Sequence, residues 1–211
     1  MGNTVIWKPA SSAMLSAYYI MRLLEEAGLP PGVINLVPGD AAEISSVLLS
    51  HHELAGVHFT GSTTVFNSMW RTIGANMSNY ATYPRIVGET GGKDFIVAHP
   101  SADAQSLAVA IARGGFEYQG QKCSAASRVY VPRSMWNDVR DRVVAMMDEM
   151  RMGDVTDFRN FVGAVIDEKS FKKISEYLDD ARVNAKIVSG GVAKGDEGYF
   201  IKPTLVQAKE P

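Results

Sequence analysis

Short apolar runs alternate with longer amphipathic stretches through the first part of the chain. The runs are rich in β-branched and aromatic residues, which favours strands, and the stretches repeat apolar residues at helical intervals. This alternation of strand and helix predicts parallel βαβ units. The expected strands are residues 3–7, 33–37, 57–59 and 85–87, and the expected helices are residues 12–27, 40–49 and a stretch from 61–62 into 67–83.

Side-chain spacing within these helices indicates which residues pack and where the helices begin. Asp40 with Glu43 three residues later has the pattern of a capping box, so a helix is expected to start there. Gly28 is expected to end the first helix. The predicted apolar stripe of that helix is Leu15, Tyr19, Leu23 and Ala27, and the residues of 67–83 with core-like spacing are Met69, Trp70, Ile73 and Met77.

The pattern changes beyond Gly92, so we divide the chain at about residue 91. Residues 1–91 are expected to be part of one α/β domain and residues 92–211 part of another. An Ala-rich helix is expected to lead into the segment that holds the only cysteine. The expected strands of the second part are 95–97, 125–131, 187–188 and 199–201, and its expected helices are 102–118, 134–150 and 168–183, with a glycine loop at 190–195.

Composition narrows the class of protein but identifies no chemistry. The 211 residues are 46% hydrophobic and carry a formal net charge of −2, so neither a nucleic-acid partner nor a membrane surface is expected. We find no membrane-spanning run and no signal peptide. One cysteine excludes an internal disulfide and fits a reducing compartment. The four histidines lack metal-ligand spacing, so no metal site is expected.

The segment Phe116–Ser124 carries the candidate nucleophile, Cys123. A lone thiol in a chain of this size is often only a small buried residue, which is one interpretation here. Its context favours another, because Gly120 permits a tight bend before the thiol and Lys122 supplies positive charge that favours the reactive thiolate. Glu89 is set between glycines and backbone bends, from which its carboxylate could act as a base.

Two further positions follow predicted strands, where open parallel sheets bind ligands. Lys8 comes just after strand 3–7 and can pair with a ribose or a phosphate, or it is simply a solvated lysine. Gly61–Val65 opens a helix directly after strand 57–59. The N–H groups and partial positive charge of a helix N-terminus suit a pyrophosphate, although a glycine turn with a serine cap would look the same.

These motifs together resemble the aldehyde dehydrogenase superfamily. The glutamate of Glu89-Thr90-Gly91-Gly92-Lys93 stands 34 residues before the cysteine of Gly120-Gln121-Lys122-Cys123, and Trp7-Lys8-Pro9 and Phe59-Thr60-Gly61-Ser62 precede them in the family's order. The resemblance runs over nearly the whole chain, but the chain covers less than half of a family member. Three segments, 2–9, 116–125 and 164–171, are similar to the members that oxidise L-glutamate γ-semialdehyde, formed from 1-pyrroline-5-carboxylate, to L-glutamate in proline degradation.

The resemblance implies a role for each candidate residue and NAD as the cofactor. It implies a partial Rossmann-type NAD-binding domain followed by a partial catalytic domain. Cys123 would attack the aldehyde and Glu89 would activate the water that hydrolyses the thioester. Lys8 would contact the adenosine ribose of NAD, and Ser124 would help hold the substrate's α-carboxylate, unless its hydroxyl only bonds nearby backbone. The residues implied at the NAD pyrophosphate are Gly61, Ser62, Thr63, Thr64 and Val65.

Two positions depart from the common family pattern. Ser11 stands where many members have a glutamate that shares the ribose, which puts that second contact in doubt. Phe66 stands where many have a glycine, a substitution that suits the glutamate-semialdehyde subgroup. In the family, an asparagine that stabilises the oxyanion comes from an upstream segment, and a Glu-x-Phe segment that grips the nicotinamide ribose comes from downstream. We therefore expect residues 1–211 alone to be inactive.

Three alternatives remain open from the sequence. The chain could serve another semialdehyde, because substrate groups come partly from other segments, or it could be a non-catalytic fragment. A cysteine hydrolase is a third, although no histidine has a recognisable partner motif. The resemblance implies a small-molecule aldehyde substrate, a homo-oligomeric full-length form, and a cytoplasmic location, or the mitochondrial matrix in a eukaryote.

Overall fold

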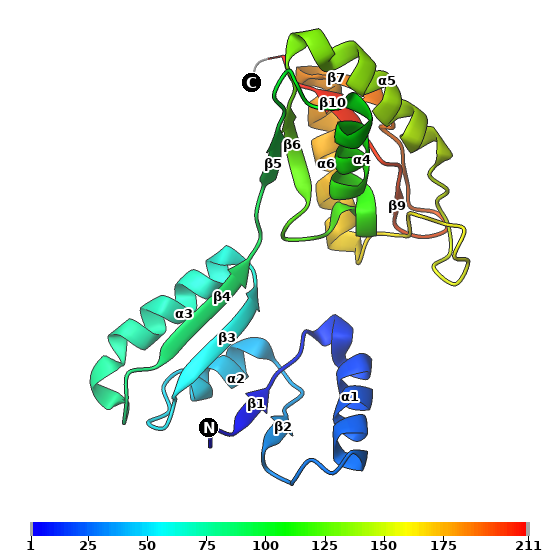
Figure 1. Cartoon of the computed structure of the whole chain (residues 1–211). Helices are drawn as coiled ribbons and strands as arrows, with labels where there is room; N and C mark the ends of the chain where they lie inside the picture. Colours follow the sequence, from blue (N-terminus) through cyan, green and yellow to red (C-terminus); the bar gives the residue numbers. More distant parts are fainter. Residues whose placement is uncertain (1, 210–211) are drawn as a thin grey trace. The chain divides into compact units, whose positions relative to one another are not determined.

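The computed structural model describes residues 2–209, which form two compact units (Figure 1). One unit ends at Thr90 and the other begins at Gly91, beside the residue where the sequence pattern changes. No helix in the described residues is long and apolar enough to cross a membrane.

The first unit consists of two pairs of parallel strands with helices between them. β1 pairs with β2 and β3 pairs with β4, both in parallel, which confirms the predicted βαβ units. Its elements are β1 (Val5–Trp7), η1 (Ser11–Ala13), α1 (Met14–Glu26), β2 (Ile34–Leu36), α2 (Ala41–Leu48), β3 (Gly56–Gly61), α3 (Thr63–Ala75), η2 (Met77–Asn79) and β4 (Arg85–Thr90).

Side-chain caps fix where α2 and α3 begin. The Asp40 carboxylate accepts hydrogen bonds from the N–H groups of Ala42 and Glu43, at 2.8 and 3.0 Å, which confirms the predicted start of α2. The Ser62 hydroxyl accepts from the N–H of Val65 at 3.2 Å and caps α3. Each cap lies directly after a strand or its exit, so both helices start near the carboxyl end of a parallel pair.

One prediction about a helix face is wrong, and a second is correct for only some of its residues. Leu15, Tyr19 and Leu23 lie on the exposed face of α1, where Leu15 is 70% exposed, and Ala17 is the buried residue of that helix. In α3 and the turn after it, Ile73 is buried as predicted, but Trp70 is 53% exposed and Met77 is also exposed. The reason is the same in both cases, since a two-stranded sheet covers only one side of a helix that is apolar on more than one.

The second unit combines one parallel pair with two antiparallel pairs. β5 pairs with β6 in parallel, whereas β7 with β10 and β8 with β9 are antiparallel. Its elements are β5 (Asp94–Val97), α4 (Ala104–Phe116), η3 (Glu117–Gly120), β6 (Ala126–Tyr130), α5 (Arg133–Glu149), α6 (Glu168–Asn184), β7 (Lys186–Ser189), β8 (Ala193–Lys194), β9 (Phe200–Ile201) and β10 (Leu205–Gln207).

The core of the second unit lies between α4 and α5. Each helix contributes three buried residues at helical spacing, and residues of β5 and β6 pack against them. This core holds α4, the helix that ends just before the cysteine segment. The buried residues are Leu107, Ala108 and Ile111 of α4, and Val139, Val143 and Met147 of α5.

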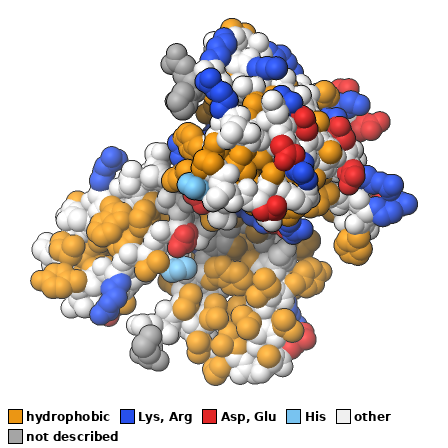
Figure 2. Space-filling view, turned by 45° about the horizontal axis from the view of Figure 1, so that its top comes forward, with side chains coloured by type: hydrophobic (Ala, Val, Ile, Leu, Met, Phe, Trp, Pro, Cys, Tyr) orange, Lys and Arg blue, Asp and Glu red, His pale blue; other side chains and the backbone are white. Residues whose placement is uncertain are grey.

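Much apolar surface is exposed in both units. Within the described residues every sheet has two strands, so each has free edges. Figure 2 shows hydrophobic side chains over much of the visible face. Three of the most exposed large apolar residues are Phe158, Tyr83 and Val183, with exposed fractions of 98%, 80% and 74%. Surface of this kind usually marks contacts with further protein.

Candidate active site

Glu89 lies near the carboxyl end of the parallel pair β3–β4. In the strand register Glu89 stands opposite Thr60, and Thr90 stands opposite Gly61. The sequence predicted that the strand would end at Val87 and that Glu89 would be among bends, which is wrong, because β4 continues through Thr90. Burial alternates along β4, so Glu89 and Val87 are on its exposed face while Gly88 is on the covered one. The candidate base therefore lies on a strand, next to the Gly61–Ser62 turn.

The N-terminus of α3 has the donors that an anion requires. The Ser62 side chain and carbonyl accept from the N–H groups of Val65 and Phe66, at 3.2 and 3.0 Å. For the N–H groups of Thr63 and Thr64, no acceptor is found among residues 2–209. No acidic side chain occupies the first turn of this 13-residue helix. Free N–H groups and the helix dipole fit a phosphate group there.

The Phe66 ring packs against Gly88 of β4, where any other residue would place a side chain in the space of the ring. A Cβ at Gly88 would lie 2.2 Å from the Phe66 ring. The ring also stacks on Phe59, with centroids 6.0 Å apart, and meets the Trp70 ring edge-on, with centroids 6.3 Å apart. The aromatic residue at position 66 is thus matched by a glycine on the adjoining strand.

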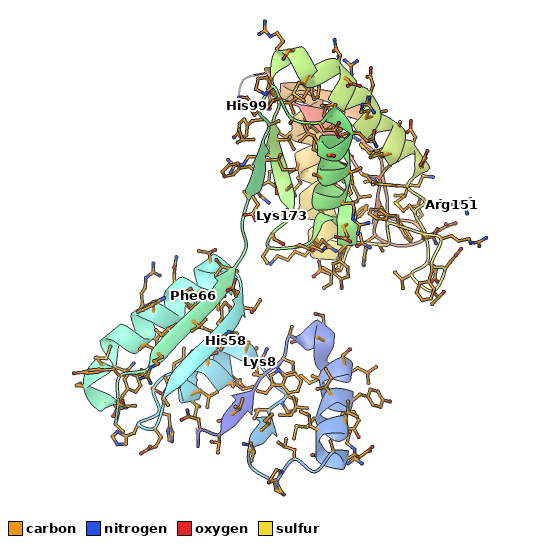
Figure 3. The ribbon with its side chains drawn as sticks, viewed as in Figure 1. Lys8, His58, Phe66, His99, Arg151 and Lys173 are labelled. Atoms are coloured by element: carbon orange, nitrogen blue, oxygen red, sulfur yellow. The ribbon has the colours of Figure 1, made fainter. Side chains whose placement is uncertain are left out.

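Lys8 follows β1 and is half-buried, close to the start of α2 (Figure 3). Its Nζ donates to the carbonyl oxygen of Pro9 at 2.9 Å. Hydrogen bonds from the N–H groups of Glu43 and Ala42 lower the pKa of Asp40, and the charge of Lys8 lowers it further. Lys8 therefore lies at the carboxyl end of the β1–β2 pair, which is the ligand-binding end of a parallel sheet.

The cysteine segment begins with a left-handed turn at the end of α4. Gly114 and Gly115 let the helix lie close to β6, since a Cβ at Gly114 would be 3.2 Å from that of Ala126. Tyr118 and Gln119 then take φ values of 57° and 58°, and Gly120 one of 66°. A Cβ at Gly120 would lie 2.7 Å from the carbonyl oxygen of Gly115, which agrees with the bend that the sequence predicted there.

Cys123 is exposed near the apex of the next turn. The N–H of Ala125 donates to the carbonyl of Lys122 at 3.2 Å and closes this turn, and Ala125 is buried beneath it. The alternative of a small buried cysteine is therefore wrong. For the N–H of Cys123, no acceptor is found within residues 2–209. An exposed thiol beside a free backbone donor is the arrangement that nucleophilic attack on a carbonyl requires.

Gly92 lies against the backbone carbonyl of Cys123. A Cβ at Gly92 would lie 2.9 Å from the Cys123 carbonyl oxygen and 3.2 Å from Asp94 Oδ1. Only Thr90 and Gly91 separate Gly92 from Glu89 in the sequence. The sequence singled out this glycine as part of a motif, but no pattern within the motif indicated that it contacts the cysteine segment.

Lys122 is paired with a carboxylate. Its Nζ donates to Glu117 Oε2 at 2.7 Å, and Arg113 Nη2 donates to Glu117 Oε1 at 2.7 Å. The hydrogen bond and charge of Lys122, together with the charge of Arg113, hold the pKa of the Glu117 carboxyl below its ordinary value. The sequence predicted that the charge of Lys122 would favour the Cys123 thiolate. In the structure the ammonium group of Lys122 instead pairs with Glu117, and this ion pair spans the left-handed turn.

Ser124 is exposed beside Cys123, and no hydrogen bond of its hydroxyl is found in the described part of the chain. Its side chain is therefore free to meet a substrate. No cluster of three or more His, Cys, Asp or Glu side chains suited to a metal ion is present in residues 2–209.

Each unit thus carries part of the candidate site. The first holds Glu89, the Gly61–Val65 helix start and Lys8 at the carboxyl ends of its strands. The second holds Cys123, Ser124 and Gly92 around one turn. Gln119 and Gln121, for which the sequence predicted no role, hydrogen-bond from the cysteine segment to Gly163 and Ile166.

Comparison with known proteins places these motifs in context. The sequence model of the aldehyde dehydrogenase family matches residues 1–211. A probable delta-1-pyrroline-5-carboxylate dehydrogenase from Schizosaccharomyces pombe is 48% identical over 217 residues, and the mitochondrial delta-1-pyrroline-5-carboxylate dehydrogenase of Homo sapiens is 42% identical over 214 residues. Each alignment covers 100% of this chain, but 40% and 38% of those proteins respectively.

A solved structure gives the same result. The crystal structure of the Delta-pyrroline-5-carboxylate dehydrogenase from Mycobacterium tuberculosis bound with NAD matches with a TM-score of 0.94 and 49% sequence identity. The match covers 100% of this chain and 40% of that one. The chain therefore spans less than half the length of the relatives it matches.

Proposed function

The chain belongs to the aldehyde dehydrogenase family, and from that premise we propose that it carries the nucleophile, the base and part of the NAD site of an enzyme that oxidises L-glutamate γ-semialdehyde to L-glutamate. Its fold is part of the fold of that family. The observation that carries the proposal is Cys123, exposed near a turn apex with a free N–H. The names of the relatives, which specify 1-pyrroline-5-carboxylate, support the substrate.

The reaction begins at Cys123. Its thiolate attacks the aldehyde carbon, forming a C–S bond, and the carbonyl electron pair moves to the oxygen. The N–H of Cys123 donates to this oxyanion, a role for which fixed donors typically contribute about 10²–10³ in rate. The hydride leaves this carbon as the electron pair on the oxygen re-forms the C=O bond, which gives the thioester; NAD, when bound, would supply the hydride acceptor. Ser124 helps to hold the α-carboxylate of the substrate.

Glu89 completes the reaction. Its carboxylate takes a proton from water as the water oxygen attacks the thioester carbon, and the C–S bond breaks to release L-glutamate and the thiolate. Lys8 binds the adenosine ribose, and the N-terminus of α3, Gly61–Val65, binds the pyrophosphate through its N–H groups. The free Thr63 and Thr64 amides support this assignment.

The test uses a chimaera in which residues 1–211 replace the matching segment of the Mycobacterium tuberculosis relative. With glutamate semialdehyde and NAD, Cys123→Ala should produce no NADH but still bind NAD. Glu89→Gln should give a burst of NADH followed by very slow turnover, because water activation follows hydride transfer. Glu149→Gln, on the exposed end of α5, is the matched control and should behave as the parent. Normal turnover in Cys123→Ala would refute the proposal.

The substrate and the assembly have separate tests. A parent chimaera that prefers a semialdehyde without an α-amino acid group would favour the alternative of a different semialdehyde dehydrogenase. Activity on the aldehyde that is present with NAD and absent without it excludes a cysteine hydrolase. We also infer a homo-oligomer in the full-length form, checked by light scattering. We infer a cytoplasmic location or, in a eukaryote, the mitochondrial matrix; the names of several relatives include the word mitochondrial.

A further inference from the structure

The turn before Cys123 adopts a backbone that its residues do not favour. Tyr118 and Gln119 are consecutive non-glycine residues with left-handed φ angles of 57° and 58°. Such residues cost free energy and persist only where surrounding contacts hold them. Packing gives this turn little support, because Tyr118 is 69% exposed and an open pocket of about 270 Å³, lined in part by Gln119, lies beside it. Polar contacts must therefore hold the turn.

Gln119 supplies the first of these contacts. With its amide oriented so that both groups are paired, Nε2 donates to the carbonyl of Tyr118 at 2.8 Å, and Oε1 accepts from the N–H of Gly163 at 2.7 Å. Gly163 is buried, and a Cβ there would lie 2.6 Å from the Gln119 amide. The amide thus fits against a position that only glycine leaves open.

Gln121 supplies the second contact, two residues before Cys123. Its Oε1 accepts from the N–H of Ile166 at 3.1 Å. Both glutamines therefore bond to one short segment, residues 162–166, across more than forty residues of sequence.

The segment 162–166 is itself fixed. Val162 and Val165 are buried, at 2% and 5% exposure. The carbonyl of Val162 accepts from the N–H of Gly153 at 3.0 Å, and the N–H of Val165 donates to Tyr199 at 2.9 Å. The two glutamine amides thus join the cysteine segment to a part of the unit that is bonded on both flanks.

We propose that Gln119 and Gln121 are positioning residues, which clamp the Cys123 turn to residues 162–166 and so set where the thiol lies. Gln121 acts only as an acceptor at this clamp, whereas Gln119 acts as donor and acceptor. The catalytic consequence rests on the proposed function, but the clamp itself does not.

Amide hydrogen exchange in the 211-residue chain tests the clamp without any reaction. Gln121→Met should raise the exchange rate of the Ile166 N–H by about tenfold or more, and Gln119→Met that of Gly163, because each loses its acceptor. Gln121→Glu keeps an acceptor oxygen and should restore protection. Gln119→Glu should not, because its second carboxylate oxygen would face the Tyr118 carbonyl oxygen where Nε2 donated, and this repulsion should displace the side chain from Gly163. The control is Gln105→Met on α4, which removes a side-chain acceptor of Arg142 on α5. It should leave the exchange rates of both amides unchanged.

The kinetic arm uses the chimaera. Gln121→Met should lower kcat by about 10-fold or more with KM little changed, since a misplacement of 1 Å can cost about 10²-fold. Gln121→Glu should recover most of the loss. Unchanged exchange at Ile166 in Gln121→Met, or an equal change in Gln105→Met, would overturn the clamp. Raised exchange with parental kcat would overturn its role in placing the thiol, and an inactive parent chimaera would count against the proposed function alone.

Discussion

Replacing Gly92 with alanine should push the Cys123 turn away and slow the chemistry at its thiol. The added methyl would lie 2.9 Å from the Cys123 carbonyl oxygen. Carbon–oxygen contacts are ordinarily about 3.3–3.6 Å, so the carbonyl has to retreat by roughly 0.5 Å. The obstacle is backbone, which cannot rotate aside as the end of a flexible side chain would. Overpacking of this kind costs about 1–3 kcal/mol of stability.

The kinetic effect follows from the size of the displacement. If a shift of about 1 Å costs 10²-fold, half that shift costs about tenfold on a logarithmic scale. In the chimaera, we expect the NADH burst of Gly92→Ala to be about tenfold slower, with NAD affinity unchanged because the cofactor residues lie in the other unit. Rapid-mixing measurement of the burst and calorimetric titration with NAD give the two quantities.

Gly115→Ala is the matched control. It also places a methyl against a backbone carbonyl of the same unit, that of Ala126, but at an ordinary contact distance of 3.5 Å. Its burst should equal that of the parent. A parental burst in Gly92→Ala, or an equal loss in Gly115→Ala, would show that the contact between Gly92 and the Cys123 carbonyl does not place the thiol.

Two further predictions concern the cofactor and the isolated chain. Lys8→Ala in the chimaera should weaken NAD binding by about 1–3 kcal/mol, the range for a hydrogen bond to a charged group. The control Lys172→Ala on α6 should not weaken it. Equal NAD affinities of the two variants by calorimetry would mean that Lys8 is only a solvated lysine. Residues 1–211 alone should form no NADH from glutamate semialdehyde and NAD, because every described sheet has only two strands and much apolar surface is bare; turnover near that of the chimaera would contradict this.

The order of strands and helices was predictable because it depends on local pattern. Short β-branched runs separated by capped helical stretches indicated the parallel pairs β1–β2 and β3–β4 and the Asp40 cap. The antiparallel strands β8 and β10 were missed. They are two and three residues long, so they have too few positions to show a period. β8 pairs locally with β9, whereas β10 pairs with β7, on the far side of the glycine loop.

Which face of a helix is buried could not be read from α1. The stripe Leu15, Tyr19 and Leu23 and the opposite stripe around Ala17 are both apolar. Periodicity identifies such stripes but cannot choose between them when both are present. The choice is made by the β1–β2 pair, which covers one side only and leaves Leu15, Tyr19 and Leu23 exposed.

The candidate site was predictable as a set of residues but not as a set of contacts. Cys123 and Glu89 could be named from their motifs, whereas the left-handed Tyr118 and Gln119 could not, because neither residue type favours that backbone. The bonds of Gln119 and Gln121 to residues 162–166 join distant parts of the sequence. No local pattern carries that information.

The geometry gives a physical reason for the form of the motif Glu89–Gly92. Its glutamate belongs to β4, where pairing with β3 fixes it opposite Thr60 beside the start of α3. Its last glycine belongs to the other unit, where the lack of a Cβ lets the Cys123 carbonyl approach. The base and the contact that places the thiol are therefore only three residues apart in the chain, although the base and the thiol lie in different units. The motif thus supplies a short connection between Glu89 and Gly92. An insertion in this connection should impair catalysis more than substitution of its two middle residues, because the insertion lengthens the connection while both the β4 pairing and the Gly92 contact stay in place.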